Sequence, residues 1–266
     1  MENGTDRMSN ESTKPLATKP LAGKIALVSG AGQNIGRAIA HGLAADGATV
    51  WINGRSNRGA LDTVAEEIED AGGHAFSHVA DVSDENAVRA MIERIADEAG
   101  GIDIVVSNAG LRRQTPIVEM TYAEWREILS VALDGAFLLA RATVPHMKAR
   151  GGGAFIGMSG MSNHLGTSGR AHVSASKAGL EGLVRGLAME LAGDNITVNA
   201  VAPGAIDTER GAAAGERPSG TAARIPLGRA GTVDEIAAMV RHLAGPHGRY
   251  ITGQCIHVNG GMYLGH

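Results

Sequence analysis

A glycine-rich turn is the first segment whose residue types suggest chemistry. The apolar run Ile25–Ser29 leads directly into Gly30-Ala-Gly-Gln-Asn-Ile-Gly36, after which a helical pattern begins. Glycines allow positive φ and let backbone N–H groups approach a pyrophosphate, which binds at the positive end of the next helix. An ordinary strand-to-helix turn can also be rich in glycine. The position after the first strand, however, favours a dinucleotide-binding loop.

Three further polar segments follow later apolar runs. Asp81-Val82 comes after the third run, where a carboxylate can accept a hydrogen bond from an adenine amino group. Ser107-Asn-Ala-Gly110 ends the fourth run, and Pro203-Gly-Ala-Ile-Asp-Thr208 follows the sixth. In a parallel sheet all of these positions lie at the carboxyl edge, where such sheets bind ligands.

The elements that must position these residues alternate along the chain. Short runs rich in Val and Ile predict strands at Ile25–Ser29, Thr49–Asn53, His74–Ala80, Ile104–Ser107, Ala154–Met158, Thr197–Ala202 and Cys255–Val258. Helical spacing predicts helices at Gly36–Asp46, Gly59–Ala71, Asp84–Ala99, Thr121–Arg150, Ser174–Ala192 and Val233–Ala244. Continuously apolar strands alternating with helices indicate a parallel sheet covered on both faces. We therefore predict an α/β fold, a single doubly wound Rossmann domain with a seven-stranded parallel sheet flanked by helices.

Composition narrows the class of protein further. Residues 1–21 are polar and aperiodic, so we predict a disordered N-terminal arm before a domain over residues 22–266. The net charge of −4 argues against nucleic-acid and polybasic membrane binding. A single cysteine, no secretory signal and no apolar run long enough to span a bilayer favour a cytoplasmic protein.

The ordered motifs LAGKIALVSGAGQNIG, DV, SNAG, SASKAGLEGL, ITVNAVAPGAIDTE and ITGQCIHVNGG resemble the short-chain dehydrogenase/reductase family over residues 21–266. The resemblance implies a bound nicotinamide dinucleotide, a small carbonyl or alcohol substrate, a homotetramer and a substrate loop over residues 205–224. Within the family the chain is similar to 3-oxoacyl-carrier-protein reductases and to sugar or polyol dehydrogenases. The cofactor-binding positions that it implies are Gly30, Gln33, Asn34, Ile35, Gly36, Asn53, Arg55, Ser56, Asp81, Val82, Asn108, Ala109, Gly110, Lys177, Pro203, Gly204, Ile206 and Thr208.

The end of the second strand bears on the choice of cofactor. An acidic residue there binds the ribose 2′-hydroxyl of NAD and repels the 2′-phosphate of NADP. This chain has Gly54 at that position, and Arg55 can pair with a phosphate. Gly32-Gln33 lacks the basic residue that many NADP-type relatives carry in the first loop. We predict NADP as the preferred cofactor and keep NAD as the alternative.

The family's catalytic residues are mostly missing. Relatives use an Asn, a Ser, a Tyr and a Lys, of which Tyr exchanges the proton with the substrate oxygen. Lys177 occupies the Lys position, but the Tyr, Ser and Asn positions hold Val173, Gly160 and Ala132. Valine cannot transfer a proton, and a positioned general acid contributes about 10²–10⁴-fold in rate. Redox turnover in this chain therefore requires a different proton relay.

Several side chains can replace the missing acid and the missing hydroxyl. His172 lies beside the vacated Tyr position, but one residue on a helix is about 100° of rotation. His164 follows the fifth strand, Ser159 and Ser162 flank Gly160, and Lys177 can hold a water. We therefore name Lys177, His172, Ser162 and His164 as catalytic candidates.

No metal site is predicted, because His164 and His172 lack a carboxylate at ligand spacing and Cys255 is distant in sequence. Three functions remain open. The first is an NAD(P)(H)-dependent oxidoreductase with a non-standard relay. The second is an NADP-binding protein or regulatory subunit without turnover. The third is non-redox lyase chemistry on the same scaffold, which ranks low because the nucleotide loop is retained.

Overall fold

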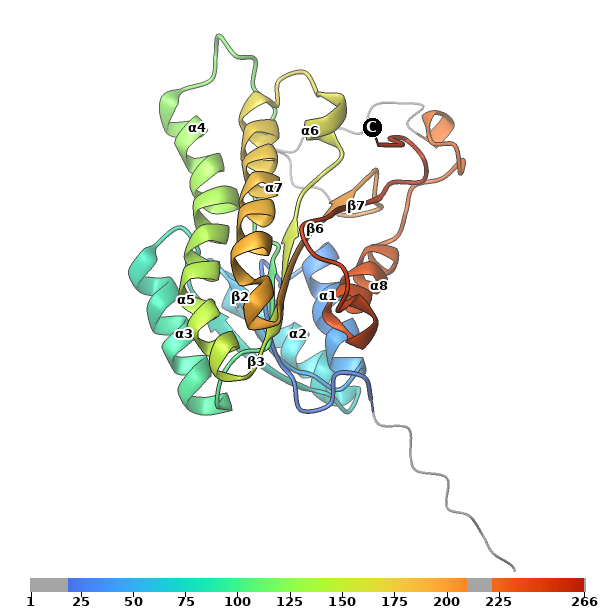
Figure 1. The fold of residues 1–266 in the computed structure, drawn as a ribbon. Helices are drawn as coiled ribbons and strands as arrows, with labels where there is room; N and C mark the ends of the chain where they lie inside the picture. Colours follow the sequence, from blue (N-terminus) through green and yellow to red (C-terminus); the bar gives the residue numbers. More distant parts are fainter. Residues whose placement is uncertain (1–18, 210–221, 266) are drawn as a thin grey trace, which may run out of the picture.

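The computed structural model describes residues 19–209 and 222–265 (Figure 1). The predicted arm at 1–21 and the predicted substrate loop at 205–224 therefore lie mostly outside the described residues. The domain also begins earlier than we predicted. Leu21 is 2 % exposed within the core, and its N–H donates to the carbonyl of Asp46 at 2.9 Å.

The predicted seven-stranded sheet is confirmed. Its strands are β1 (Ile25–Ser29), β2 (Thr49–Gly54), β3 (His74–Val79), β4 (Ile104–Ser107), β5 (Gly153–Met158), β6 (Ile196–Pro203) and β7 (Cys255–Val258). All pairings are parallel, and the strand order is β3-β2-β1-β4-β5-β6-β7. The chain reverses direction across the sheet between β1 and β4. This is the switch point at which doubly wound sheets bind ligands.

Helices cover both faces of the sheet (Figure 1). One core layer packs α1 (Asn34–Ala45), α2 (Arg58–Asp70) and α8 (Val233–Ala244) on the sheet. The other layer packs α3 (Glu85–Ala99), α5 (Gly135–Ala149) and α7 (Ala171–Leu191). Leu27 and Val28 of β1 belong to opposite layers, because successive strand side chains alternate between faces. Both are fully buried, as continuously apolar strands require.

Three helical details differ from the predictions and bear on the site. Helix α7 begins at Ala171, before the predicted Ser174, so His172 and Val173 lie on the helix. The predicted helix Thr121–Arg150 is α4 (Tyr122–Leu129) and α5 joined by a π-helical turn, Ser130–Asp134. A short helix, α6 (Ser162–Leu165), follows β5 and was not predicted. π-Helical turns are frequent at functional sites, and this one contains Ala132.

The joined stretch Tyr122–Ala149 is the one helix in the described part of the chain that is long and apolar enough to cross a membrane. Its most apolar window is 44 % buried inside the protein. Leu139, Ala140 and Met147 of α5 pack in the core layer shared with α3 and α7. These contacts are those of a core helix. The expected absence of membrane binding stays a prediction.

Candidate active site

A pocket of about 310 Å³ opens at the carboxyl edge of β1, β2 and β4. Its volume is at the lower end of the range for small-molecule sites. Many of the predicted cofactor residues line it, namely Gly30, Gln33, Asn53, Arg55, Ser56, Asp81, Val82, Ala109 and Gly110. The sequence analysis used Gly32 and Gly54 only to predict the choice of cofactor, and it did not single out the other lining residues, namely Asn57, Ala60, Leu61, Ala80, Leu111 and Val131.

The glycine-rich turn is tightly built against the end of β4. Gly30 has φ +63°, a conformation that favours glycine. A Cβ at Gly36 would lie 2.3 Å from the Gly30 carbonyl oxygen and 2.6 Å from Nδ2 of Asn108. That amide nitrogen donates to the carbonyls of Ser29 and Gly30 at 2.9 Å each. Gly36 and Asn108 thus shape the loop and do not line the pocket.

Other predicted cofactor residues also have structural contacts. Asn34 has φ +51°, and its side chain exchanges two hydrogen bonds with the backbone of Glu209, at 2.9 and 3.1 Å. Ile35 is 7 % exposed and packs in the core. The amide of Asn53 donates to the carbonyls of His78 and Ala80 at 3.2 and 3.0 Å. The turn residue Asn34 therefore connects the nucleotide loop to the chain that follows β6.

The predicted cofactor residues at the end of β6 and after it are not part of the pocket lining that the described residues form. Within the described residues, Pro203, Gly204, Ile206 and Thr208 do not line the 310 Å³ pocket. Gly204 packs against the Cα of Asn259, to which a Cβ would lie at 2.6 Å, and Ile206 bridges to Gly231. Their predicted cofactor contacts remain predictions.

The charges beside the pocket favour an anion at the end of β2. Gly54 leaves this position without a carboxylate, and Leu61 lies 3.1 Å from where its Cβ would be. The Arg55 guanidinium lies 3.8 Å from the carboxylate of Glu127, which pairs more closely with Arg113 at 2.7 Å. Arg55 is half exposed, so its charge can turn toward a ligand in the pocket.

Lys177 is the one predicted catalytic residue that lies beside the pocket lining. Its Nζ donates to the carbonyl of Met158 at 2.5 Å, and a Cβ added to Gly110 would lie 3.5 Å from it. Burial, reinforced by the positive charge of Arg112, lowers the pKa of Lys177 to about 8. An amine with this pKa exchanges protons near neutral pH far more readily than an exposed lysine does.

The vacated catalytic positions are small or apolar in the structure as well. Val173 lies one helical turn before Lys177 and is 8 % exposed, and Ala132 is 3 % exposed. A Cβ at Gly160 would meet one neighbour within 4 Å, the Oγ of Ser162 at 3.9 Å. The hydroxyl of Ser162 therefore lies close to the place of the missing serine. Ser159, in contrast, is buried and donates to Glu181 at 2.5 Å.

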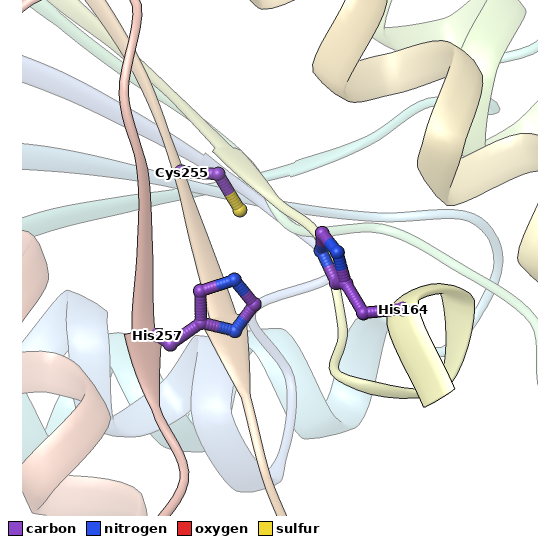
Figure 2. Close-up of side chains that lie close together, drawn as sticks. All are labelled: His164, Cys255 and His257. Atoms are coloured by element: carbon purple, nitrogen blue, oxygen red, sulfur yellow. The ribbon is translucent and has the colours of Figure 1, made fainter. Parts of the chain in front are cut away.

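The two histidine candidates point to other partners. His172 is fully buried, and its Nε2 lies 3.1 Å from Oε1 of Glu124, which also accepts from Thr115. A ring without exposed surface cannot contact a substrate directly, so the buried position of His172 argues against the predicted role as the catalytic acid. His164 lies 3.0 Å from Oε1 of Glu181, with its ring 4.5 Å from that of His257. Figure 2 shows it directed toward His257 and Cys255.

The residues around His164 form a cluster that the sequence analysis missed. It joins His164 of α6, Glu181 of α7 and Cys255 and His257 of β7. Burial, followed by the Glu181 carboxylate, raises the pKa of the Cys255 thiol to about 12, so the free thiol is a poor nucleophile. The sequence signal was the Cys-x-His spacing on a strand, which places both side chains on one face.

The fold and the pocket define a Rossmann-type protein with a glycine-rich loop after β1, Arg55 at the end of β2 and Lys177 beside Gly110. The sequence profile of the family described as Enoyl-(Acyl carrier protein) reductase matches residues 30–263. The chain belongs to the short-chain dehydrogenase/reductase family.

The relatives of this chain include reductases from several bacteria. The 3-oxoacyl-(acyl-carrier-protein) reductase FabG of Staphylococcus aureus is 40 % identical over 242 residues, which cover 91 % of this chain and 98 % of the relative. FabG of Escherichia coli is 40 % identical over 244 residues, with 91 % and 98 % coverage. Among solved structures, a blue fluorescent protein from a metagenomic library in complex with NADPH matches with TM-score 0.86 and 35 % identity. The match covers 92 % of this chain and all of that one.

Proposed function

We propose that this protein is an NADP(H)-dependent oxidoreductase that interconverts a small carbonyl compound and its alcohol through a proton relay centred on Lys177. The observation that carries the proposal is the position of the Lys177 Nζ beside Gly110, with its pKa lowered to about 8. The NADPH complex of the structural relative and the FabG relatives support the choice of NADP and of reduction.

The residues present fit a dinucleotide. The backbone around Gly30 and Gly36 closes so tightly that a side chain at Gly36 would strike the Gly30 carbonyl. The N-terminus of α1 supplies the positive end that a pyrophosphate prefers. Asp81 and Arg55 both line the pocket. In this proposal Asp81 accepts a hydrogen bond from the adenine amino group, and Arg55 pairs with the 2′-phosphate of NADP. When bound, the cofactor supplies or accepts a hydride.

The chain's own residues then have to move the proton. Lys177 in its ammonium form donates a proton to the nascent alkoxide, directly or through a water that it holds, and takes the proton back in the oxidative direction. The Oγ of Ser162 would lie 3.9 Å from a Cβ at the vacated serine position, Gly160, and can donate a hydrogen bond to the same substrate oxygen. Val173 gives this wall of the site an apolar surface in place of a phenol.

One observation favours a second function, an NADP-binding protein without redox turnover. The three positions that normally supply the Tyr, Ser and Asn are Val173, Gly160 and Ala132, and two of them are buried apolar residues. The NADP site would then serve regulation or assembly. Proton transfer distinguishes the two functions, because only the oxidoreductase needs Lys177 to titrate.

We also propose a homotetramer, as the family resemblance implies. Phe137 on α5 and Met189 on α7 are 46 % and 85 % exposed, although both are large and apolar. Gly182 and Gly186 on α7 have open space where a side chain would be, which lets a second helix approach closely. Light scattering should give a mass near four times 27.3 kDa, and a mass near 27.3 kDa would contradict the tetramer.

The function is tested by measuring NADPH and NADP absorbance during incubation with ketones, sugars, polyols and oxoacyl thioesters. Turnover of at least one carbonyl–alcohol pair, with a preference for NADP over NAD, is the expected result. Tight NADP binding with no turnover of any pair in either direction would favour the second function. No affinity for either dinucleotide would refute both.

A further inference from the structure

The cluster at the far edge of the sheet has the composition of a metal site. His164, Cys255 and His257 each offer one ligand atom, and these atoms lie within 4.8 Å of one another (Figure 2). They come from α6 and β7, while Glu181 approaches from α7. We predicted no metal site because His164 lacked a carboxylate at ligand spacing and Cys255 was distant in sequence. In the folded chain both Glu181 and Cys255 lie close to His164.

The contacts of Glu181 show how strongly the donors converge. A single oxygen, Oε1, lies 2.5 Å from Ser159 Oγ, 3.0 Å from Asn163 Nδ2, 3.0 Å from His164 Nε2 and 3.3 Å from Cys255 Sγ. A carboxylate oxygen offers about two lone-pair sites, so four neighbours exceed its capacity as an acceptor. A cation bound to the Cys255 thiolate, the His164 imidazole and the carboxylate would replace the contacts of Oε1 with Cys255 and His164. Ser159 and Asn163 would then remain as its two hydrogen-bond donors.

His257 adds an independent indication. Its Nδ1 is buried and has no hydrogen-bond partner among the residues that the structure describes, and such an unpaired ring nitrogen is costly. The ring packs against His164 at 4.5 Å and against Tyr263 at 4.7 Å between centroids, so it is held in the cluster. The His257 imidazole is therefore held where one of its ring nitrogens can serve as a metal ligand.

We propose that His164, Cys255 and His257, together with Glu181, bind a zinc ion. Two imidazoles, one thiolate and one carboxylate suit tetrahedral zinc. Zinc bonds of about 2.0–2.3 Å place neighbouring ligand atoms about 3.3–3.6 Å apart. The ligand atoms of His164, Cys255 and His257 lie within 4.8 Å of one another and therefore have to shift by about 1 Å. Glu181 lies outside this three-residue group and has to turn a carboxylate oxygen toward the ion. Binding displaces the thiol proton of Cys255 to solvent.

The ion would connect three elements that adjoin the proposed relay. His164 lies two residues after Ser162, and Glu181 lies one helical turn after Lys177. Zinc would therefore hold α6 against α7 and β7, and so fix Ser162 relative to Lys177. Its role is structural, because Glu181 is 6 % exposed and leaves little room for a substrate. This last step rests on the proposed function, whereas zinc binding itself does not.

The test is metal binding by the full-length, untagged protein. The protein is stripped with a chelator, and zinc chloride is titrated in by calorimetry. Cobalt(II) is then added as a spectroscopic probe of the thiolate. The variants are Cys255→Ser, His257→Gln and the matched control His247→Gln, whose ring lies on the exposed surface outside the cluster.

We expect one zinc per chain, a cobalt–thiolate charge-transfer band, and affinity about 100-fold weaker or more in Cys255→Ser and His257→Gln. His247→Gln should bind like the wild type. Absence of stoichiometric zinc binding, or unchanged affinity in Cys255→Ser, would overturn the proposal. Should the cluster variants fail to fold, the cobalt spectrum of the wild type still decides, because a spectrum without a thiolate band contradicts it. These readouts are independent of turnover, so zinc can bind even where the proposed function fails.

Discussion

Two glycines of one loop should differ strongly in how much the same substitution destabilises the protein. In Gly36→Ala the new methyl group would lie 2.3 Å from the Gly30 carbonyl oxygen and 2.9 Å from the Cα of Ala31. Both are backbone atoms, so neither can rotate away. In Gly32→Ala the nearest atoms are side-chain carbons of Ala60 and Leu61 at 3.5 Å, an ordinary contact.

The structure allows the cost in Gly36→Ala to be worked out. Overpacking of a well-packed region costs about 1–3 kcal/mol. The methyl group would also displace Asn108, whose Nδ2 would lie 2.6 Å away and which makes two hydrogen bonds to the loop. Their loss adds about 1 kcal/mol each. We therefore expect about 3–5 kcal/mol of destabilisation, and a melting temperature lower by about 6–20 °C for a domain of this size.

The assay is thermal unfolding of both variants with and without NADP. Gly36→Ala should unfold at a lower temperature and lose the stabilisation that NADP gives the wild type. Gly32→Ala should change the free energy of unfolding of the protein without ligand by less than about 0.5 kcal/mol. Equal melting temperatures for the two variants would refute the geometry that we assign to the loop.

Three further predictions concern cofactor choice and proton transfer. Arg55→Ala should weaken the affinity for NADP by about 10–100-fold and leave the affinity for NAD nearly unchanged, since a charge-assisted hydrogen bond contributes about 1.5–3 kcal/mol. Glu127→Gln removes the carboxylate that lies 3.8 Å from Arg55 and should increase the affinity for NADP. Equal effects on both cofactors in calorimetry would contradict this reasoning. Because the ammonium form of Lys177 is the acid, kcat for reduction should fall as pH rises through about 8 and kcat for oxidation should rise, whereas pH-independent rates between 6 and 10 would exclude the relay. Gly160→Ser should fold normally, because among the described residues outside its chain neighbours the new Cβ meets only the Ser162 Oγ, at 3.9 Å. In steady-state assays Gly160→Ser and Val173→Tyr together should raise activity more than the sum of their single effects, and strict additivity would contradict this.

The same titration has a consequence for stability. The pKa of Lys177 is lower in the folded protein than in the unfolded chain, so the unfolded chain binds more protons between pH 8 and about 10.5. The free energy of unfolding should therefore increase, and the folded protein become more stable, as pH rises through this window. Lys177→Met should remove that contribution, which denaturant unfolding at pH 7.5 and 9.5 can measure.

The sheet could be predicted because its strands are continuously apolar and separated by helices of regular spacing. β1, β4 and β7 begin and end at the predicted residues, since buried parallel strands need only an uninterrupted apolar run. Helix α7 was harder to delimit. Its first turn contains His172, which is polar by type yet fully buried through its pairing with Glu124, and no local pattern reveals that partner.

Part of the candidate site could be predicted from sequence and part could not. The pocket residues that follow β1, β2 and β3 are placed by strand order, so Gly30, Arg55 and Asp81 could be predicted from sequence. The roles of the two histidines could not, because Glu124 and Glu181 are 48 and 17 residues away from them. Cys255 and His257 share one strand face, but their meeting with His164 depends on how α6 folds over β7.

In the proposed reaction Lys177 replaces the missing tyrosine as the proton carrier of an NADP-dependent reduction. The most direct measurement is the rate of NADPH oxidation, at saturating NADPH, by the wild type and by Lys177→Met on a carbonyl substrate that the panel reveals. We predict turnover by the wild type and a loss of about 10²-fold or more in Lys177→Met. A kcat of Lys177→Met within about twofold of the wild-type value would contradict the role of Lys177 as the proton carrier, because the loss of a general acid costs about 10²-fold or more.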